Sequence, residues 1–308
     1  MNDGRNGDGA GRFPASVAVT GANGQVGKAV LKALESFPAA VTALVRAPSV
    51  VSHTPAVEDW LRSEQALRIV RQAEAVVHLA GTLNPPDHDY EEANVAPAER
   101  LIAALDPRRT RKIVFLSYVG ASEASKNSYL RTKARVERML RATGIPVLVF
   151  RCTHIVGTPT APGPTARTML AIGARSVTVL GNGKQRIAPV FVGDVAAAIV
   201  AALGSGISGT FDLQGPEVMS LDELVHILNA PYTVEIRHVP AFIAPLLAFV
   251  GPKLPAALID LMVRDCRSNA PSALEVFGAV STSLRTIWKV SPVGAGSGEH
   301  AHEIVRTA

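Results

Sequence analysis

One helix-forming stretch of the sequence, residues 127–140 (NSYLRTKARVERML), carries a single tyrosine with a lysine four residues later. Positions i and i+4 of a helix lie on the same face, so Tyr129 and Lys133 would stand side by side. A free phenol has a pKa of about 10, and an adjacent ammonium favours its anion. Tyr129 could therefore serve as an acid–base, although an ordinary half-buried aromatic beside a solvated lysine is the alternative.

A serine precedes this helix at the end of the apolar run 112–117. If the run is a strand of a parallel sheet, its carboxyl end borders the ligand crevice, and the following helix begins at the same edge. Ser117, Tyr129 and Lys133 can then converge on a bound ligand. We expect Ser117 to hold a substrate oxygen while Tyr129 exchanges a proton with it.

A second stretch, TGANGQVG, places Gly21, Gly24 and Gly27 between an apolar run and an amphipathic pattern. The first glycine permits a tight strand-to-helix turn, the second lets bare backbone approach a pyrophosphate, and the third lets the helix pack closely. Phosphates then lie at a helix N-terminus, where free N–H groups favour negative charge. The stretch predicts a dinucleotide site made by Gly21, Asn23, Gly24, Gln25, Val26 and Gly27.

The end of the second apolar run indicates which dinucleotide is bound. An acidic residue there would accept hydrogen bonds from the adenosine ribose of NAD, but this sequence has Arg46 in ALVRAPS. An arginine can pair with a 2′-phosphate through two hydrogen bonds, so we expect NADP rather than NAD. A solvated arginine is the alternative. Asp59 either accepts from the adenine amino group or caps the helix that begins near Ser63.

The elements that must position these residues alternate along the first half of the chain. Apolar runs predict strands at 16–20, 40–45, 75–80, 112–117 and 146–150, with helical patterns between them. Continuous apolar strands that alternate with helices predict a parallel sheet covered on both faces, and right-handed crossovers make it doubly wound. We therefore expect an α/β Rossmann fold with a smaller C-terminal substrate lobe.

The predicted lobes interleave along the chain. After residue 155 the sequence turns to loops rich in Thr, Pro and Gly, with a predicted hairpin at 177–191 and a short helix at 220–229. The expected organisation is a disordered tail at 1–12, a dinucleotide-binding domain at 13–155 with 188–205 returning to it, a substrate lobe at 156–187 and 206–290, and a disordered tail at 291–308.

The composition argues against several classes of protein. The chain is 47% hydrophobic and 19% charged, its N-terminus lacks an apolar signal, and its longest apolar stretch, 239–252, is proline-interrupted and too short for a membrane span. Only two cysteines are present, which suits a reducing compartment and predicts a cytoplasmic location. The net charge of +5 is scattered without an aromatic platform, so we expect no nucleic acid and an anionic small molecule instead. No ligand spacing indicates a metal.

The motifs together resemble the short-chain dehydrogenase/reductase superfamily, in particular its extended and atypical NAD(P)-binding, epimerase/dehydratase-like branch. Within that branch the chain is similar to the group of the nucleotide-binding accessory subunit of respiratory complex I. The matching segments, in order, are TGANGQVG, VVHLAG, ANVAPAERLIAAL, VFLSYVGAS, YLRTKARVE and VLVFRCTHIVG. The resemblance implies that Tyr129 is the acid–base, Lys133 binds nicotinamide ribose and tunes Tyr129, Ser117 orients substrate, and Leu79, Ala80 and Gly81 line the cofactor.

Some positions depart from the family pattern. Cys152 stands where the family usually has proline, Tyr118 replaces a common second serine, and the absence of an Asp-Glu pair after the fifth strand argues against a sugar-nucleotide dehydratase. We predict an NADP(H)-dependent oxidoreductase that acts on a carbonyl or alcohol of a hydrophobic small molecule, with the apolar segment 239–263 covering its pocket. A non-catalytic NADP(H)-binding structural or regulatory subunit and a nucleotide-sugar epimerase are the alternatives. The sequence leaves the oligomeric state open.

Overall fold

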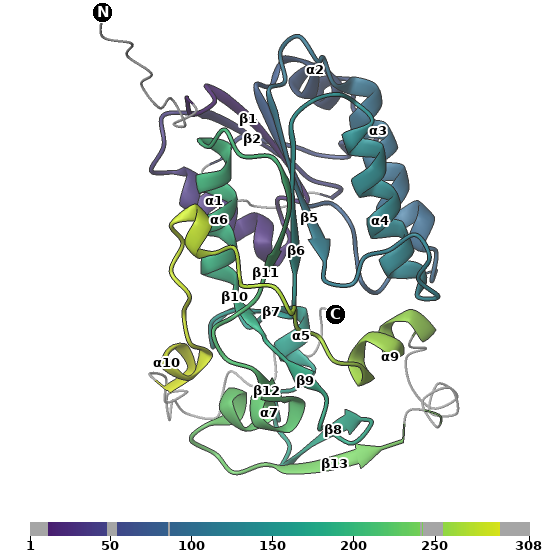
Figure 1. Ribbon diagram of the computed structural model, residues 1–308, viewed down its shortest axis with the longest axis vertical. Coiled ribbons are helices and arrows are strands. Elements are labelled where there is room, and N and C mark those ends of the chain that lie inside the picture. Colours follow the sequence, from purple (N-terminus) through teal and green to yellow (C-terminus); the bar gives the residue numbers. More distant parts are fainter. Residues whose placement is uncertain (1–11, 48–53, 86, 241, 243–254, 290–308) are drawn as a thin grey trace, which may run out of the picture.

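The computed structural model describes residues 12–47, 54–85, 87–240, 242 and 255–289. Its centre is a seven-stranded sheet in the order β11-β6-β5-β4-β1-β2-β3, and every pairing in it is parallel (Figure 1). The strands are β1 (Ser16–Thr20), β2 (Ala40–Leu44), β3 (Ala56–Val57), β4 (Ala75–His78), β5 (Lys112–Tyr118), β6 (Val147–Cys152) and β11 (Gly209–Leu213). The strand order reverses between β1 and β4, and the carboxyl ends of these strands therefore border the ligand crevice of a doubly wound fold.

The central strands form because their apolar runs are buried on both faces. All four residues of β4 are buried, as are four of the five in β1. Val17 is in register with Val41 of β2 and with Ala75 of β4, so β-branched and small side chains stack across the middle of the sheet. Such uninterrupted apolar strands are typical of parallel sheets, and the predicted Rossmann architecture is confirmed.

Helices cover both faces of this sheet (Figure 1). One core cluster joins α1 (Gln25–Leu34) and α6 (Val192–Leu203) to one face, and residues 192–203 thus form the predicted helix that returns to the main sheet. A second cluster joins the other face to α2 (Glu64–Gln72), α3 (Ala96–Ala104) and α4 (Ser128–Arg141). A short π-helix, η1 (Glu91–Val95), leads directly into α3.

A smaller lobe lies beyond the carboxyl ends of the strands and has its own core (Figure 1). It contains three two-stranded pairings rather than a continuous sheet. These join β7 (Ile155–Val156) to β10 (Val190–Phe191), β8 (Ser176–Leu180) to β13 (Glu235–Val239) and β9 (Arg186–Ile187) to β12 (Met219–Ser220). The helices described in this lobe are α5 (Gly163–Arg167), α7 (Leu221–Asn229), α9 (Ala256–Val263) and α10 (Leu284–Lys289).

Two expectations about this lobe differ from the structure. The predicted hairpin at 177–191 is wrong, because β8 pairs in parallel with β13 and β9 pairs with β12. The chain bends at the glycines between β8 and β9, where Gly181 and Gly183 have φ of 84° and 69°. In addition, β11 was expected in the small lobe but extends the main sheet beside β6.

The C-terminal apolar segment is described only in part. β13 ends at Val239, residues 241 and 243–254 lie outside the described residues, and α9 follows. Among the helices that the structure describes, none is long and apolar enough to cross a membrane. The tails predicted to be disordered, 1–12 and 291–308, lie outside the described residues apart from Arg12.

Candidate functional site

The glycine-rich turn after β1 is packed too tightly for larger residues. Gly21 has φ of +65°, and a Cβ there would lie 2.7 Å from the carbonyl carbon of Leu79. A Cβ on Gly27 would lie 2.3 Å from the carbonyl oxygen of Gly21. These contacts match the roles expected for the first and third glycines, which are a tight turn and close helix packing.

The start of α1 fits a phosphate group. Gly24 is the N-cap residue, is exposed, and as a glycine has no side chain that could cap the helix. The first N–H groups of α1 therefore remain available to an anion, in a turn where a bare glycine backbone allows close approach. The glycines and the uncapped helix would hold the pyrophosphate of a dinucleotide.

The side chains that follow in this turn are used for packing between the lobes. Gln25 Nε2 donates to the carbonyl oxygen of Pro162 at 3.4 Å, and a Cβ on Gly163 would lie within 2.1 Å of the same nitrogen. Val26 is partly buried against the core below α1, and Asn23 is half-buried in the turn. Any cofactor contact from Gln25 and Val26 would thus come from their backbone N–H groups.

The adenosine end of the predicted site is formed by Arg46 and Asp59. Arg46 follows β2 and is exposed, as a residue that pairs with a 2′-phosphate must be. Asp59 is also exposed and has φ of 43°. The helix-capping interpretation of Asp59 is wrong, because Ser63 caps α2 with its own hydroxyl, which accepts from the N–H of Ala66. An adenine contact by Asp59 stays a prediction.

The loop after β4 lies at the carboxyl edge of the sheet, where we expect the nicotinamide end of the cofactor. The N–H groups of Leu79 and Ala80 donate to Thr20 Oγ1 at 3.2 and 3.3 Å, which ties the loop to β1. Gly81 has φ of +144°, and a Cβ there would lie 3.6 Å from Lys133 Nζ. The structure therefore brings the predicted loop and the predicted catalytic lysine to the same edge of the sheet.

Asn94 shapes this loop from the π-helix η1. Its Oδ1 accepts from the N–H of Thr82 at 3.0 Å, and its Nδ2 donates to the carbonyl oxygens of Thr82 and Tyr90. π-Helices are rare and frequently occur at functional sites. The conformation of Gly81 depends on this contact, because Asn94 Oδ1 occupies the space in which a Cβ on Gly81 would lie.

Tyr129 and Lys133 lie on one face of α4, as the spacing predicts. Lys133 Nζ is 5.7 Å from the centroid of the Tyr129 ring and 4.8 Å from that of Phe115. It donates to the carbonyl oxygen of Leu116 at 2.9 Å. Burial lowers the pKa of Lys133 to about 8, and the nearby carboxylate of Glu137 partly opposes this shift.

The electrostatic setting of Tyr129 differs from the expectation. Its ring is 8% exposed and meets the rings of Tyr90 and Tyr118 edge-on, with centroid distances of 6.1 and 5.7 Å. Burial raises the pKa of Tyr129, whereas we expected Lys133 to lower it. The reason is geometric: the ammonium is hydrogen-bonded to the backbone of β5, and the phenol is enclosed by aromatic rings.

Ser117 does not join this set. Its hydroxyl donates to Glu137 Oε1 at 2.6 Å, and Glu137 accepts from Arg151 Nε at 2.9 Å and Nη2 at 2.7 Å. The Glu137 side chain is only 1% exposed. Tyr118, the next residue of β5, is the one that contacts Tyr129. A charge in the apolar run VLVFRC and a glutamate four residues after Lys133 were the sequence signals for this ion pair.

His78 lies beneath the site as a neutral side chain. It is fully buried, its Nδ1 is 2.8 Å from Thr20 Oγ1, and its Nε2 has no hydrogen-bond partner among the described residues. Burial, with a smaller influence from the charge of Lys133, lowers the pKa of His78 to about 3. Within the described part of the chain, no group of His, Cys, Asp and Glu side chains could hold a metal ion.

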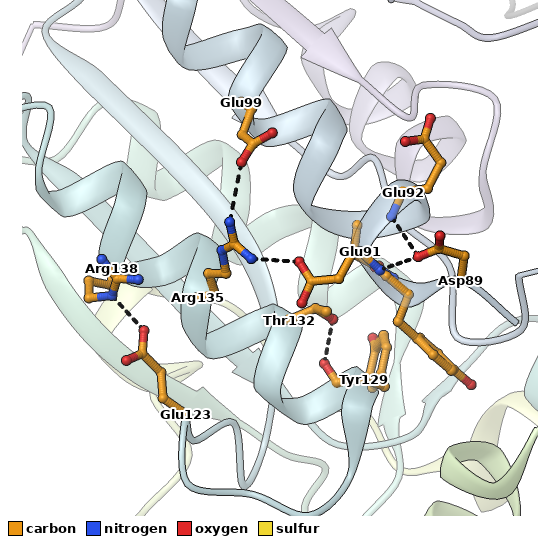
Figure 2. A network of polar contacts seen from close by, with 11 residues as sticks. Asp89, Glu91, Glu92, Glu99, Glu123, Tyr129, Thr132, Arg135 and Arg138 are labelled. Carbon is orange, nitrogen blue, oxygen red and sulfur yellow. Dashed lines mark hydrogen bonds and ion pairs between the residues drawn. The ribbon is translucent and has the colours of Figure 1, made fainter.

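The outer face of α4 is tied to its neighbours by ion pairs. Arg135 lies between Glu91 of η1 and Glu99 of α3, at 2.9 and 3.4 Å, and Arg138 pairs with Glu123 (Figure 2). These residues are well exposed, so each pair contributes less than about 1 kcal/mol. Their effect is to link the helix that carries Tyr129 to the π-helix that carries Asn94.

A family model described as the NAD dependent epimerase/dehydratase family matches residues 17–211. The chain belongs to this family. The match covers the glycine-rich turn, both residues of the Tyr129–Lys133 pair and all or most of every strand of the main sheet. The membership is in keeping with an NAD(P)-binding fold, and it leaves the reaction open.

Two curated relatives are named as subunits of NADH dehydrogenase or of NADH-ubiquinone oxidoreductase. An Arabidopsis thaliana protein named NADH dehydrogenase (ubiquinone) 1 alpha subcomplex subunit 9, mitochondrial, is 31% identical over 218 residues, which is 68% of this chain and 52% of the relative. The mitochondrial NADH-ubiquinone oxidoreductase 40 kDa subunit of Neurospora crassa is 26% identical over 73% of this chain and 62% of its own. The chain thus spans only part of the length of each relative. Both are named as mitochondrial proteins, which overturns the predicted cytoplasmic location.

Solved structures with the same fold include enzymes. UDP-glucose 4-epimerase of Thermus thermophilus, in complex with NAD, has a TM-score of 0.68 at 21% identity and covers 89% of this chain and 98% of its own. A monomeric L-threonine 3-dehydrogenase from a metagenome has a TM-score of 0.67 at 18% identity, with coverage of 89% and 96%. At these identities the likeness establishes the fold alone.

Proposed function

We propose that this chain is an NADP(H)-dependent oxidoreductase that interconverts a carbonyl and an alcohol on a hydrophobic small molecule. The observation that carries the proposal is the position of Lys133 Nζ, which lies within reach of Gly81 at the crevice and one helical turn from Tyr129. A lysine and a tyrosine so placed, at the carboxyl edge of a doubly wound sheet, suit hydride transfer with proton exchange.

NADP(H), when bound, would supply or accept the hydride. Lys133, whose ammonium donates to the carbonyl oxygen of Leu116, would donate to the nicotinamide ribose. Tyr129 would exchange a proton with the substrate oxygen. The apolar rings of Tyr90 and Tyr118 would exclude water from that oxygen, which strengthens the hydrogen bond from the phenol.

The preference for NADP rests on Arg46. Its exposed guanidinium at the end of β2 can form two hydrogen bonds with a 2′-phosphate, and no acidic residue takes its place. The hydrophobic character of the substrate rests on the apolar segments around α9. A cavity of about 460 Å³ between α9 and the start of α4 is lined largely by polar residues and does not include Tyr129, so we do not assign it to the substrate.

The position of Ser117 favours a second candidate. Without a serine beside Tyr129, the site lacks the group expected to orient a carbonyl, and the phenol has a raised pKa. The second candidate is a non-catalytic NADP(H)-binding subunit of a complex I-type assembly in mitochondria, where the dinucleotide stabilises the fold. The names of the two curated relatives support it.

One experiment separates the two candidates. Binding of NADPH and NADH is first measured by calorimetry, and the chain with NADPH is then assayed against a panel of aldehydes, ketones and quinones by the loss of absorbance at about 340 nm. Tight NADPH binding with turnover supports the oxidoreductase. Tight binding without turnover on the whole panel supports the structural subunit, and absence of binding contradicts both.

A further inference from the structure

A cluster of titratable side chains next to Tyr129 has no acid–base role in the proposed hydride transfer. Tyr118 comes from the end of β5, His154 from the segment after β6, and Cys266 from the segment after α9. Tyr118 and Cys266 belong to the same buried core cluster as Tyr129. The fold thus gathers a thiol, a phenol and an imidazole at the substrate end of the crevice.

These side chains form a continuous chain of hydrogen bonds. Cys266 Sγ donates to Tyr118 Oη at 3.3 Å, and Tyr118 Oη lies 2.7 Å from His154 Nδ1. When Nδ1 is the acceptor, the thiol proton can pass through the phenol to the imidazole and leave a thiolate beside an imidazolium. A thiolate is the nucleophilic form of cysteine, and a neighbouring histidine is the usual group that generates it.

The pKa values of the two cysteine thiols in the chain are shifted in opposite directions. Burial raises the pKa of both thiols, but for Cys266 the charge of His154 and hydrogen bonds with His154 and Tyr118 outweigh it and lower the pKa overall. For Cys152 on β6 burial prevails, and the pKa stays raised. The pKa of His154 is raised, because the interaction with Cys266 exceeds the opposing effect of burial.

We propose that Cys266, with His154 as proton acceptor and Tyr118 between them, is a nucleophilic thiol site for small α,β-unsaturated carbonyl compounds. The Cys266 sulfur would form a bond to the β-carbon of the C=C bond, whose π electrons move to the α-carbon. The α-carbon then takes the proton that the thiol had passed to His154. This addition is balanced without any oxidant, reductant or leaving group, and it is independent of NADP(H) turnover.

The low solvent exposure of Cys266 limits the size of the electrophile that can react with it. Cys266 is only 4% exposed, and His154 is half-buried. The reagent must therefore be small. The titratable and charged groups around the thiol are His154, Tyr118, Tyr129, Cys152 and Arg264.

Acrylamide is a suitable probe, because it is a small and uncharged α,β-unsaturated carbonyl compound. The folded full chain is incubated with acrylamide, and adducts on each cysteine are quantified by peptide mass spectrometry over pH 5–10, a range chosen around the ordinary thiol pKa of about 8.5. We expect the adduct on Cys266 to form faster than on Cys152, with a midpoint of the rate below that ordinary pKa. The Cys152→Ser variant should react like the wild type, and Cys266→Ser should not react.

Variants of His154 and Tyr118 test whether proton transfer, rather than the accessibility of the thiol, sets the pH midpoint of the reaction rate. In His154→Gln the midpoint should rise, the rate at neutral pH should fall roughly tenfold or more, and the rates at high pH should converge. Tyr118→Phe removes only the linking hydroxyl and should shift the midpoint in the same direction, which decides the matter if His154→Gln does not fold. An unchanged midpoint in the folded variants, faster reaction of Cys152, or no Cys266 adduct in the folded wild type would each overturn the proposal.

Discussion

Ser117 and Glu137 are joined by a hydrogen bond of 2.6 Å that commits the serine hydroxyl to the packing of α4 against β5. The same carboxylate accepts from Arg151 on β6 and from Arg141, whose Nη2 also donates to Thr210 on β11. One buried glutamate therefore connects the helix that carries Tyr129 and Lys133 to the strands beneath it.

Removing either partner of this bond should affect stability more than chemistry. Glu137→Gln leaves Arg151 without its counter-charge, and a broken buried ion pair typically costs about 3–5 kcal/mol. Ser117→Ala removes one hydrogen bond to a charged group, which costs about 1.5–3 kcal/mol. Denaturant unfolding of both variants measures these losses.

The kinetics of Ser117→Ala then test its role. On a verified substrate, we expect kcat within about twofold of the wild type, because the hydroxyl faces Glu137. A loss of kcat comparable to that of the Tyr129 variant below would instead return Ser117 to the catalytic set.

Replacement of Tyr129 by Phe tests the acid–base assignment. The ring keeps its edge contacts with Tyr90 and Tyr118, so NADPH affinity should barely change, while kcat falls roughly 100-fold to 10,000-fold. Tyr90→Phe is a matched control, since it also removes one phenol oxygen from the cluster, the one bonded to Leu83. Equal effects of the two substitutions would show that Tyr129 acts through packing alone.

Arg46→Ala tests the choice of cofactor. Loss of a charged hydrogen-bond pair with the 2′-phosphate should weaken NADPH binding by about 1.5–3 kcal/mol and leave NADH binding nearly unchanged. Arg68 is a second exposed arginine and lies on α2, so Arg68→Ala controls for the loss of one positive charge. Calorimetric titration with both cofactors measures the difference, and equal losses for NADPH and NADH would contradict the assignment.

The lowered pKa of Lys133 makes stability depend on pH. Its pKa is about 8 in the folded protein, against an ordinary value of 10.5. Between these values the unfolded chain binds more protons, so the free energy of unfolding rises with pH by up to about 3 kcal/mol. Urea unfolding at pH 7.5 and pH 10 should show this gain in the wild type relative to Lys133→Met. The same change in the free energy of unfolding in both proteins would mean that Lys133 titrates normally.

The same substitution should weaken cofactor binding, because Lys133 is the proposed ligand of the nicotinamide ribose. In the wild type, NADPH affinity should decline as the pH rises through about 8 and the ammonium is lost. In Lys133→Met the affinity should be lower and should not show this decline. Titrations of NADPH at several pH values with both proteins measure the two effects.

Much of the main sheet could be predicted because most of its strands are largely apolar runs, as in AVVH of β4 and IVFL of β5. The small lobe was harder, because its pairings join segments far apart in the chain. Ser176 pairs with Glu235, and Ile187 pairs with Met219. Short strands and glycine turns near residue 181 favoured a local hairpin, and nothing in the local pattern indicated the distant partners.

The site was predictable to the extent that it lies on one helix. The period of the helix places Tyr129 beside Lys133 whatever surrounds them. The direction of Ser117 depends instead on its place in a strand, where neighbouring residues point to opposite faces. Only the position of Glu137 in the folded protein shows that Ser117 faces the carboxylate and that Tyr118 faces the phenol.

The path of the chain between the lobes has an evolutionary consequence. After β6 the chain enters the small lobe, returns for α6 and β11, leaves again for α7 and α9, and comes back where Phe277 packs on Phe150 and Phe211. Neither lobe is therefore a contiguous stretch of sequence. An exchange of the small lobe for another by recombination would therefore need more than one crossover in the sequence.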